Sequence, residues 1–133
     1  MFTLPKDMET GVEKIDSQHR ELIDRLNTVR SMGEKSASRE EIRKTLDLLG
    51  EYVVKHFADE EELQKQRGYP KYEWHKEQHR LYVEEILKLK SEFATTSDVS
   101  KLTLDLSGSI LNWIVRHIKS VDVELGKFLR ASD

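Results

Sequence analysis

The sequence contains no cysteine among its 133 residues. Without thiols the chain can form no disulfide, no thiolate zinc site and no iron–sulfur cluster, and it has no cysteine nucleophile. Any metal ion must therefore be bound by histidine and carboxylate side chains. The chain offers five histidines and 25 acidic residues for that purpose.

The sequence also lacks an excess of basic charge and long apolar runs. Its 22 Lys and Arg residues against 25 Asp and Glu residues give a net charge of −3, so we expect neither nucleic acid nor a membrane as a partner. The longest apolar stretches are short pieces such as Ile110-Leu111, and the first residues lack the basic and apolar regions of a secretion signal. The cytoplasm is the expected compartment.

Residues that break helices are scarce. Two prolines and six glycines interrupt a chain that is 35% charged and 37% hydrophobic, which favours long amphipathic helices over strands. We predict a single domain over 1–133, with an N-terminal arm over 1–15 and four helices at about 16–33, 38–67, 70–95 and 98–130. The connections between them are short, which is typical of an antiparallel, up-down-up-down four-helix bundle, an all-α fold whose core often holds metal.

Local signals place the ends of these helices. Asp16 is a plausible N-cap of the first helix, and Gly33 supplies its C-terminal stop. The segment 38–41 reads Ser-Arg-Glu-Glu, which is a capping box for the second helix. Pro70 suits the first position of the third helix.

All five histidines lie on the apolar faces of these helices. Residues three, four and seven apart share one face of an α-helix, because the chain turns by about 100° per residue. His19 precedes Leu22 and Ile23 by three and four residues, and His117 follows Trp113 by four. The same spacing ties the remaining histidines to apolar neighbours on their own helices: His56 to Leu49 and Val53, and His75 and His79 to Tyr82 and Ile86.

Five inward histidines on four neighbouring helices favour a metal site. A single buried imidazole needs no more than a hydrogen-bond partner, but five in one core would each cost several kcal/mol (about 2–7) if unpaired. A shared cation satisfies all of them, whereas a metal-free bundle does not. Imidazole suits iron, copper, nickel and zinc, and added carboxylates favour iron or manganese.

Two carboxylates are positioned to join the histidines. Glu60 follows His56 by four residues, so both share a face, whereas we expect its neighbours Glu61 and Glu62 to lie on a solvated face. Asp122 follows His117 by five residues, which on a regular helix turns it about 140° away. We therefore predict a break or a π-bulge between Ile118 and Val121 that returns Asp122 to the site.

The complete pattern resembles a known family. It reads His19, His56-x-x-x-Glu60, His75-x-x-x-His79 and His117-x-x-x-x-Asp122, and it is similar to the seven-ligand signature of the hemerythrins, specifically the single-domain bacteriohemerythrins. Flanking segments also match: residues 11–19 (GVEKIDSQH), Phe57 after His56, Glu61 after Glu60, Tyr69-Pro70 before His75, and residues 113–118 (WIVRHI). The resemblance extends over about residues 11–128.

The resemblance implies a non-haem di-iron centre that binds O2 reversibly, for oxygen storage, delivery or sensing. It assigns His75, His79 and His117 to one iron and His19 and His56 to the other. Glu60 and Asp122, with an oxo or hydroxo group, would bridge the two ions. The second iron then has five ligands instead of six, and its open position is the place where the family binds O2.

Two departures from the family pattern concern the surroundings of this site. Leu4 occupies a position where the family commonly has tryptophan, and Gln64 one where it often has methionine. These departures affect the packing of the arm and the wall of the pocket and leave the ligand set intact.

Other metal chemistries fit these residues less well. A zincin protease needs His-Glu-x-x-His, and residues 75–79 read His-Lys-Glu-Gln-His; a ferritin-like oxidase needs Glu-x-x-His twice, which the chain lacks. Histidine-rich ligation favours reversible binding over oxidation, so we expect a binding protein with no catalytic residues. The alternatives are a di-iron enzyme that scavenges peroxide or nitric oxide or handles iron, and the sensor domain of a larger receptor.

The aromatic residues next to the ligands have two interpretations. Phe57 and Trp113 at helical spacing are typical of core packing. Together with Leu22, Ile23 and Ile114 they could also form a dry wall around the open iron position, which would slow autoxidation. Tyr82 and Gln78 are candidates for orienting the ligand histidines through hydrogen bonds.

Overall fold

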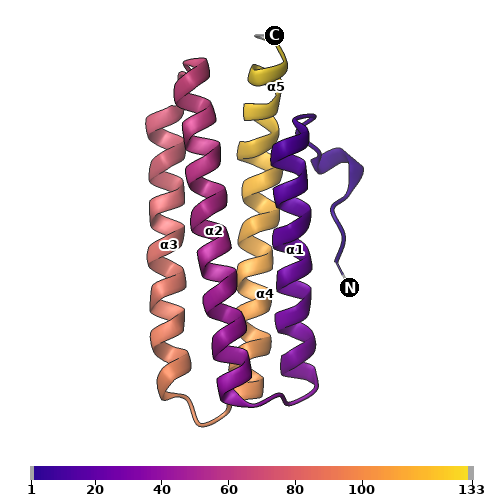
Figure 1. Ribbon diagram of the computed structural model, residues 1–133, viewed down its shortest axis with the longest axis vertical. Coiled ribbons are helices and arrows are strands. Elements are labelled where there is room, and N and C mark those ends of the chain that lie inside the picture. The colour runs from indigo at the N-terminus through magenta and orange to yellow at the C-terminus, as the bar shows by residue number, and fades with distance from the viewer. Residues whose placement is uncertain (1, 132–133) are drawn as a thin grey trace.

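The computed structural model describes residues 2–131 and is an antiparallel bundle of four long helical rods (Figure 1). No strand occurs within these residues. The first three rods are α1 (Glu13–Glu34), α2 (Arg39–Arg67) and α3 (Tyr72–Thr95). The fourth consists of α4 (Val99–His117), a π-helical turn η2 (Ile118–Asp122) and α5 (Val123–Ala131). The predicted all-α, up-down-up-down fold is confirmed.

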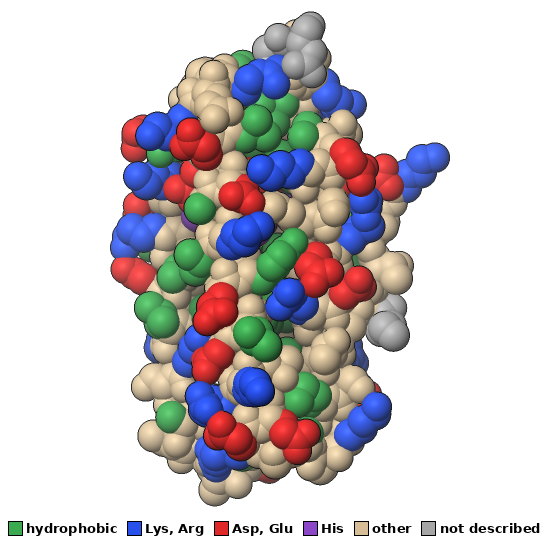
Figure 2. Space-filling view, viewed as in Figure 1, with side chains coloured by type: hydrophobic (Ala, Val, Ile, Leu, Met, Phe, Trp, Pro, Cys, Tyr) green, Lys and Arg blue, Asp and Glu red, His purple; other side chains and the backbone are tan. Residues whose placement is uncertain are grey.

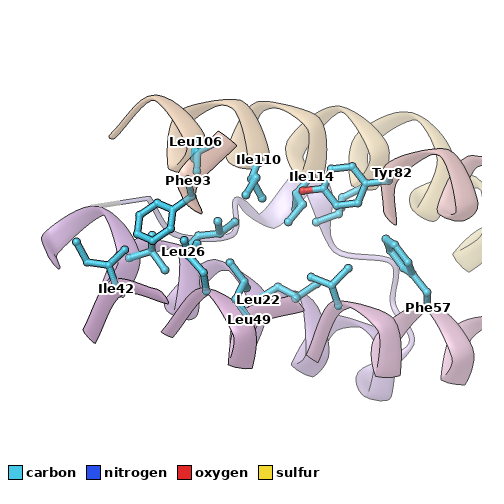
Figure 3. Close-up of a cluster of buried hydrophobic side chains, with 14 of the residues drawn as sticks. Leu22, Leu26, Ile42, Leu49, Phe57, Tyr82, Phe93, Leu106, Ile110 and Ile114 are labelled. Carbon is cyan, nitrogen blue, oxygen red and sulfur yellow. The ribbon is translucent and has the colours of Figure 1, made fainter. Parts of the chain in front are cut away.

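The connections alternate between the two ends of the bundle. The loops α1–α2 and α3–α4 lie at one end, and the loop α2–α3 lies at the other, next to α5 (Figure 1). The helix α1 packs mainly against α4 and α2. The side chains drawn in Figure 3 fill the space between the helices, with Leu26, Leu49 and Ile110 among them.

Short-range chemistry sets the ends of α2. Ser38 caps its N-terminus, since the Ser38 hydroxyl accepts a hydrogen bond from the Glu41 backbone N–H at 3.2 Å and donates to the Glu41 carboxylate at 2.9 Å. At the other end Gly68 has a φ of 66°, the left-handed conformation that glycine adopts most easily, and the Tyr69 N–H donates back to the Gln64 carbonyl. The predicted N-cap at Ser38 is therefore confirmed, but the Glu41 carboxylate bonds to the Ser38 hydroxyl and not to the Ser38 backbone N–H that a capping box uses.

Two predicted helix starts are wrong. The first helix begins at Glu13, not at Asp16, and Asp16 lies buried inside its first turn. There it accepts hydrogen bonds from the backbone N–H groups of Thr10 and Gly11, at 2.7 and 3.1 Å, so it holds the N-terminal arm instead of capping the helix. The third helix begins at Tyr72, two residues after Pro70.

The N-terminal arm is held against α5 as well as α1. It contains a short 3-10 helix, η1 (Lys6–Met8), and passes alongside α1 (Figure 1). A Cβ atom on Gly126 would lie 2.3 Å from the Thr10 carbonyl oxygen, so only glycine allows the arm to approach α5 this closely. Within residues 2–131 no helix combines the length and apolar character that crossing a membrane requires.

Candidate metal centre

Seven ionisable side chains converge in the core near the end of the bundle that carries the α2–α3 loop. Each is at most 7% exposed. They come from all four rods: His19 from α1, His56 and Glu60 from α2, His75 and His79 from α3, and His117 and Asp122 from the fourth rod. All five histidines therefore point inward, as their spacing predicts, and two groups of these side chains could each hold a metal ion.

The first group contains three histidines and one oxygen atom from each carboxylate. The His75 Nε2 atom lies 2.9 Å from Glu60 Oε1 and 3.1 Å from Asp122 Oδ1. His79 Nε2 lies 3.4 Å from the same Glu60 oxygen, and His117 Nε2 lies 3.2 Å from the same Asp122 oxygen. The Nε2 atoms of His75 and His117 are 3.2 Å apart.

The second group uses the other oxygen atom of each carboxylate. His56 Nε2 lies 3.2 Å from Glu60 Oε2, and His19 Nε2 lies 3.0 Å from Asp122 Oδ2. The Glu60 Oε2 atom is also 3.9 Å from His19 Nε2. Each carboxylate thus turns one oxygen toward the group of three histidines and the other toward the group of two. This is the arrangement expected of a carboxylate that bridges two metal ions.

These distances fit octahedral ions. Ligand atoms about 2.1 Å from an octahedral ion lie about 3.0 Å from their nearest neighbours, because the edge of an octahedron is √2 times its radius. Most of the nitrogen–oxygen distances above, from 2.9 to 3.4 Å, are of that length. The buried Nε2 atoms of His19 and His79 and all four carboxylate oxygens also satisfy no hydrogen-bond geometry. Histidine and carboxylate donors of this kind suit iron.

The electrostatics of the pocket favour a cation. Burial and repulsion by Asp122 raise the pKa of Glu60, but the histidines around it lower that pKa by more, so it lies well below its usual range. Burial lowers the pKa of His75, but the carboxylates of Asp122 and Glu60 outweigh burial and raise it to about 9. The histidines likewise lower the pKa of Asp122, so both buried carboxylates favour a positive charge between them.

The π-helical turn brings Asp122 to this site. Over Ile118–Asp122 the hydrogen bonds run from residue i+5 to residue i, and the Val123 N–H donates to the Ile118 carbonyl. A regular helix places residues five apart about 140° from each other. The wider turn takes up one extra residue, which corresponds to about 100° of rotation, and so removes most of this offset. Asp122 consequently faces the same point as His117, and the predicted π-bulge is confirmed.

Three of the five histidines have hydrogen-bond partners on their Nδ1 atoms, on the side of the ring away from the carboxylates. The Nδ1 atom of His56 lies 2.7 Å from Gln18 Oε1, and that of His79 lies 2.8 Å from Glu61 Oε2. The Nδ1 atom of His75 lies 2.9 Å from Gln64 Nε2, while Gln64 Oε1 is buried without a partner. Turning this amide by about 180° would place Oε1 where it accepts a hydrogen bond from Nδ1–H. A hydrogen bond donated by Nδ1 fixes the ring orientation and leaves Nε2 free to bind a metal.

These partners were not found by the sequence reasoning. The expectation that Glu61 lies on a solvated face is wrong, because its carboxylate contacts His79 and its side chain is 20% exposed, whereas Glu62 is exposed as expected. Tyr82 is not an outer partner in the described residues, since its buried hydroxyl has no hydrogen bond. The available signal for Gln64 was its position four residues after Glu60, on the same inward face.

Aromatic rings stack on two of the five histidines. The Phe57 ring lies parallel to His79 with centroids 3.8 Å apart, and Trp113 lies nearly parallel to His117 at 4.5 Å. Tyr82 stacks on the far side of Trp113 at 3.5 Å. Phe57 therefore lies in the hydrophobic core, and the partly buried Trp113 packs against that core.

Comparisons with known proteins agree with this geometry. Residues 10–129 match the family model described as the hemerythrin HHE cation binding domain. The chain is 33% identical to a bacteriohemerythrin of Methylococcus capsulatus, over 92% of this chain and 91% of that one. It is 30% identical to a bacteriohemerythrin of Stenotrophomonas maltophilia, over 87% and 73% of the two chains.

Solved structures give the same result. A crystal structure of wild-type hemerythrin superposes with a TM-score of 0.86 at 32% identity, and the alignment covers 97% of both chains. The fold, the buried histidine–carboxylate cluster and these relatives lead to one conclusion: the chain belongs to the hemerythrin family, whose members are O2-binding, non-haem di-iron proteins.

Proposed function

We propose that this protein binds O2 reversibly and that the seven converging side chains are the ligands of its two irons. His75, His79 and His117 bind one iron, His19 and His56 bind the other, and Glu60 and Asp122 bridge them. The observation that carries this assignment is the division of each carboxylate, one oxygen toward each histidine group.

The unequal number of histidines gives the site its function. The three-histidine position offers five protein atoms and the two-histidine position four, so an octahedral ion held by His19 and His56 would have one more place for a further ligand. A di-iron pair supplies, when bound, the two electrons that reversible O2 binding uses. The chain's own contribution is to keep one coordination position open beside His19 and His56.

The surrounding side chains keep this position dry. Leu22, Ile23 and Ile114 are each at most 3% exposed, and the Phe57 ring centroid lies 5.9 Å from that of His56. Water exclusion raises the cost of separating charge in the pocket, which opposes the loss of superoxide and hence autoxidation.

A carrier or store of O2 fits these residues better than an enzyme. Five neutral imidazoles outnumber the two carboxylates at the site, and such ligation favours release of O2 over its activation. The relatives named above are bacteriohemerythrins, and a further relative, 29% identical, is a myohemerythrin of Theromyzon tessulatum. Peroxide or nitric oxide scavenging, iron handling and a role as the sensor domain of a receptor are alternatives that no contact within residues 2–131 favours.

The decisive experiment is a cycle of anaerobic reduction, exposure to air and deoxygenation, followed by absorption spectroscopy with metal analysis. We expect two irons per chain and a charge-transfer band that disappears when O2 is removed. Irreversible oxidation with turnover of added peroxide would instead indicate an enzyme, and zinc at less than one ion per chain would rule out the di-iron assignment.

A single substitution tests the assignment of ligands to the two positions. His56→Ala leaves the two-histidine position with only one histidine, so we expect this variant to retain one iron and lose the other. Metal analysis after gel filtration measures the ratio. Equal loss of both irons would contradict the assignment.

A further inference from the structure

Four consecutive acidic residues on α2 point in four different directions. Successive side chains on a helix are rotated by about 100°, so the neighbours of an inward residue face the adjacent helices on either side. Glu60 points into the metal centre, while Asp59 lies toward α1 and Glu61 toward α3. Glu62 is exposed and contacts Gln66 on its own helix.

On the side of α2 that faces α3, the Glu61 carboxylate contacts His79 directly. His79 Nδ1 lies 2.8 Å from Glu61 Oε2, and the opposite ring atom, Nε2, lies 3.4 Å from Glu60 Oε1. The histidine thus connects a bridging carboxylate with an outer carboxylate. When Nε2 binds a metal, Nδ1 carries the proton and donates a hydrogen bond to Glu61. The negative charge of Glu61 then makes the His79 imidazole a stronger metal ligand.

On the side of α2 that faces α1, the Gln18 amide lies between the Asp59 carboxylate and His56. The Gln18 Oε1 atom lies 2.7 Å from His56 Nδ1, and the Gln18 Nε2 atom donates to Asp59 Oδ2 at 2.8 Å. Lys55 also offsets the charge of Asp59, with its Nζ atom 3.6 Å away. His56 therefore receives a neutral partner where His79 receives a charged one.

The remaining outer partner is also neutral. The Nδ1 atom of His75 meets the side-chain amide of Gln64 at 2.9 Å. Among the three Nδ1 partners described, Glu61 alone carries a charge, and it serves the three-histidine position.

We infer that Glu61 is a positioning residue that acts through His79 and makes the two metal positions unequal. This inference rests on the proposed function, since it takes the two histidine groups as two iron positions. Glu61 fixes the His79 ring and adds negative charge behind it, so the three-histidine position binds a divalent metal more tightly and holds the oxidised iron more firmly than the two-histidine position does.

The test compares Glu61→Gln with Glu62→Gln. Both changes remove one carboxylate from the same acidic run and keep the side-chain shape, but only the first alters the contact with His79. The metal-free proteins are titrated with Co²⁺ against a chromophoric chelator. We expect Glu61→Gln to weaken the tighter of the two sites about 10-fold to 100-fold, the range typical of outer partners of ligand histidines, and Glu62→Gln to match the wild type.

Two further measurements distinguish an effect of Glu61 on the position and charge of His79 from a general loss of folded structure. In the Co²⁺-loaded protein, the exchangeable Nδ1 proton of His79 gives a shifted NMR signal, which we expect to exchange faster with solvent in Glu61→Gln. In the iron-loaded protein we expect the midpoint potential to rise, because the charge that stabilises the ferric state is gone. If Glu61→Gln does not fold, Glu61→Asp decides on the same readouts, since it keeps the charge and shortens the reach.

The outcomes distinguish this inference from the proposed function. Wild-type protein that binds fewer than two Co²⁺ ions would contradict the seven-ligand assignment itself. Two ions in the wild type, with Glu61→Gln indistinguishable from Glu62→Gln in affinity, proton exchange and potential, would overturn the role of Glu61 alone.

Discussion

The two halves of the bundle are built on opposite principles. The half near the α1–α2 and α3–α4 loops, the apolar half, has a core of aliphatic and aromatic side chains: Val29, Ile42, Leu46, Leu49, Phe93 and Leu106. The half near the α2–α3 loop, the metal half, buries the five histidines with Glu60 and Asp122. The same four helical rods therefore enclose a hydrophobic core in one half and a cluster of ionisable side chains in the other.

Polar groups behave differently in the two halves. In the apolar half the buried Thr103 hydroxyl donates to the Val99 carbonyl of its own helix at 2.7 Å, so no other helix is needed to satisfy it. In the metal half the carboxylates of Glu60 and Asp122 face histidines of neighbouring rods. The apolar half thus stabilises the bundle by burial, whereas the metal half depends on charges that meet only in the folded state.

The outer surface does not divide in the same way. On the face seen in Figure 2, basic and acidic side chains alternate over the whole length of the bundle. Over the described part of the chain, exposed ion pairs one helical turn apart include Arg43 with Asp47 and Lys101 with Asp105. Such exposed pairs contribute little to stability, so the contrast between the halves lies in the core.

Metal removal should break this contrast most strongly. Each ion stabilises the folded state by about 4 kcal/mol when free metal is 1,000 times its dissociation constant, so we expect thermal unfolding of the chelated protein at a much lower temperature. Calorimetry with and without metal measures the difference. Glu60→Gln serves as the control, because a chain without this bridge should respond far less to added metal, and an equal response would contradict the assigned ligands.

A cavity in the apolar half should affect stability and leave the metal content unchanged. Leu49 is 3% exposed in the apolar core, and Leu49→Ala should lower the free energy of unfolding by roughly 3 to 5 kcal/mol. Denaturant unfolding measures this change, and metal analysis gives the number of ions per chain. If the Leu49→Ala protein lost metal under conditions in which it is still fully folded, the two halves would be coupled.

A rise in pH should lower the free energy of unfolding of the metal-free protein, through His75 in the metal half. The folded-state pKa of His75, about 9, lies above the value of 6.5 for a free histidine. Its contribution is fully present below pH 6.5 and is lost as the pH rises through 9, which amounts to a loss on the order of 3 kcal/mol. Denaturant unfolding from pH 6 to 10 tests this. We expect no such loss in the metal-loaded protein, where His75 is already deprotonated.

A substitution at the boundary of the two halves should have the smallest effect. Trp113 contacts the ligand His117 on one face and Tyr82 on the other. Trp113→Ala should raise the autoxidation rate roughly fivefold to tenfold, equivalent to about 1 kcal/mol of lost protection. Stopped-flow absorption after O2 addition measures the rate, with Trp113→Phe as the conservative control. An unchanged rate would assign Trp113 to packing alone.

Much of this architecture follows from helical spacing. The positions of His19, His75, His79 and His117 relative to apolar residues predict their inward direction, because helix periodicity is a local property of the chain. The five-residue spacing of Asp122 predicts the π-turn for the same reason. The sequence also predicts the α2 cap at Ser38, since the residues that make it are neighbours.

Other features depended on how the helices meet. The close approach of the arm to α5 is one example, because Thr10 packs where Gly126 has no side chain, and these two residues are far apart in the sequence. Glu61 belongs to an acidic run that reads as solvated until α3 packs beside it and presents His79.

The sequence by itself thus determined the helices, their inward faces and the residue types available to bind a metal. The resemblance to the hemerythrins also implied that the histidines divide into three and two around the carboxylates of Glu60 and Asp122. Only the tertiary structure decided that one of these histidines is supported by a carboxylate and two by amides. The physical reason is that the direction of a side chain around its own helix is fixed by periodicity, whereas its partner on another helix depends on the rotation and offset with which the helices pack.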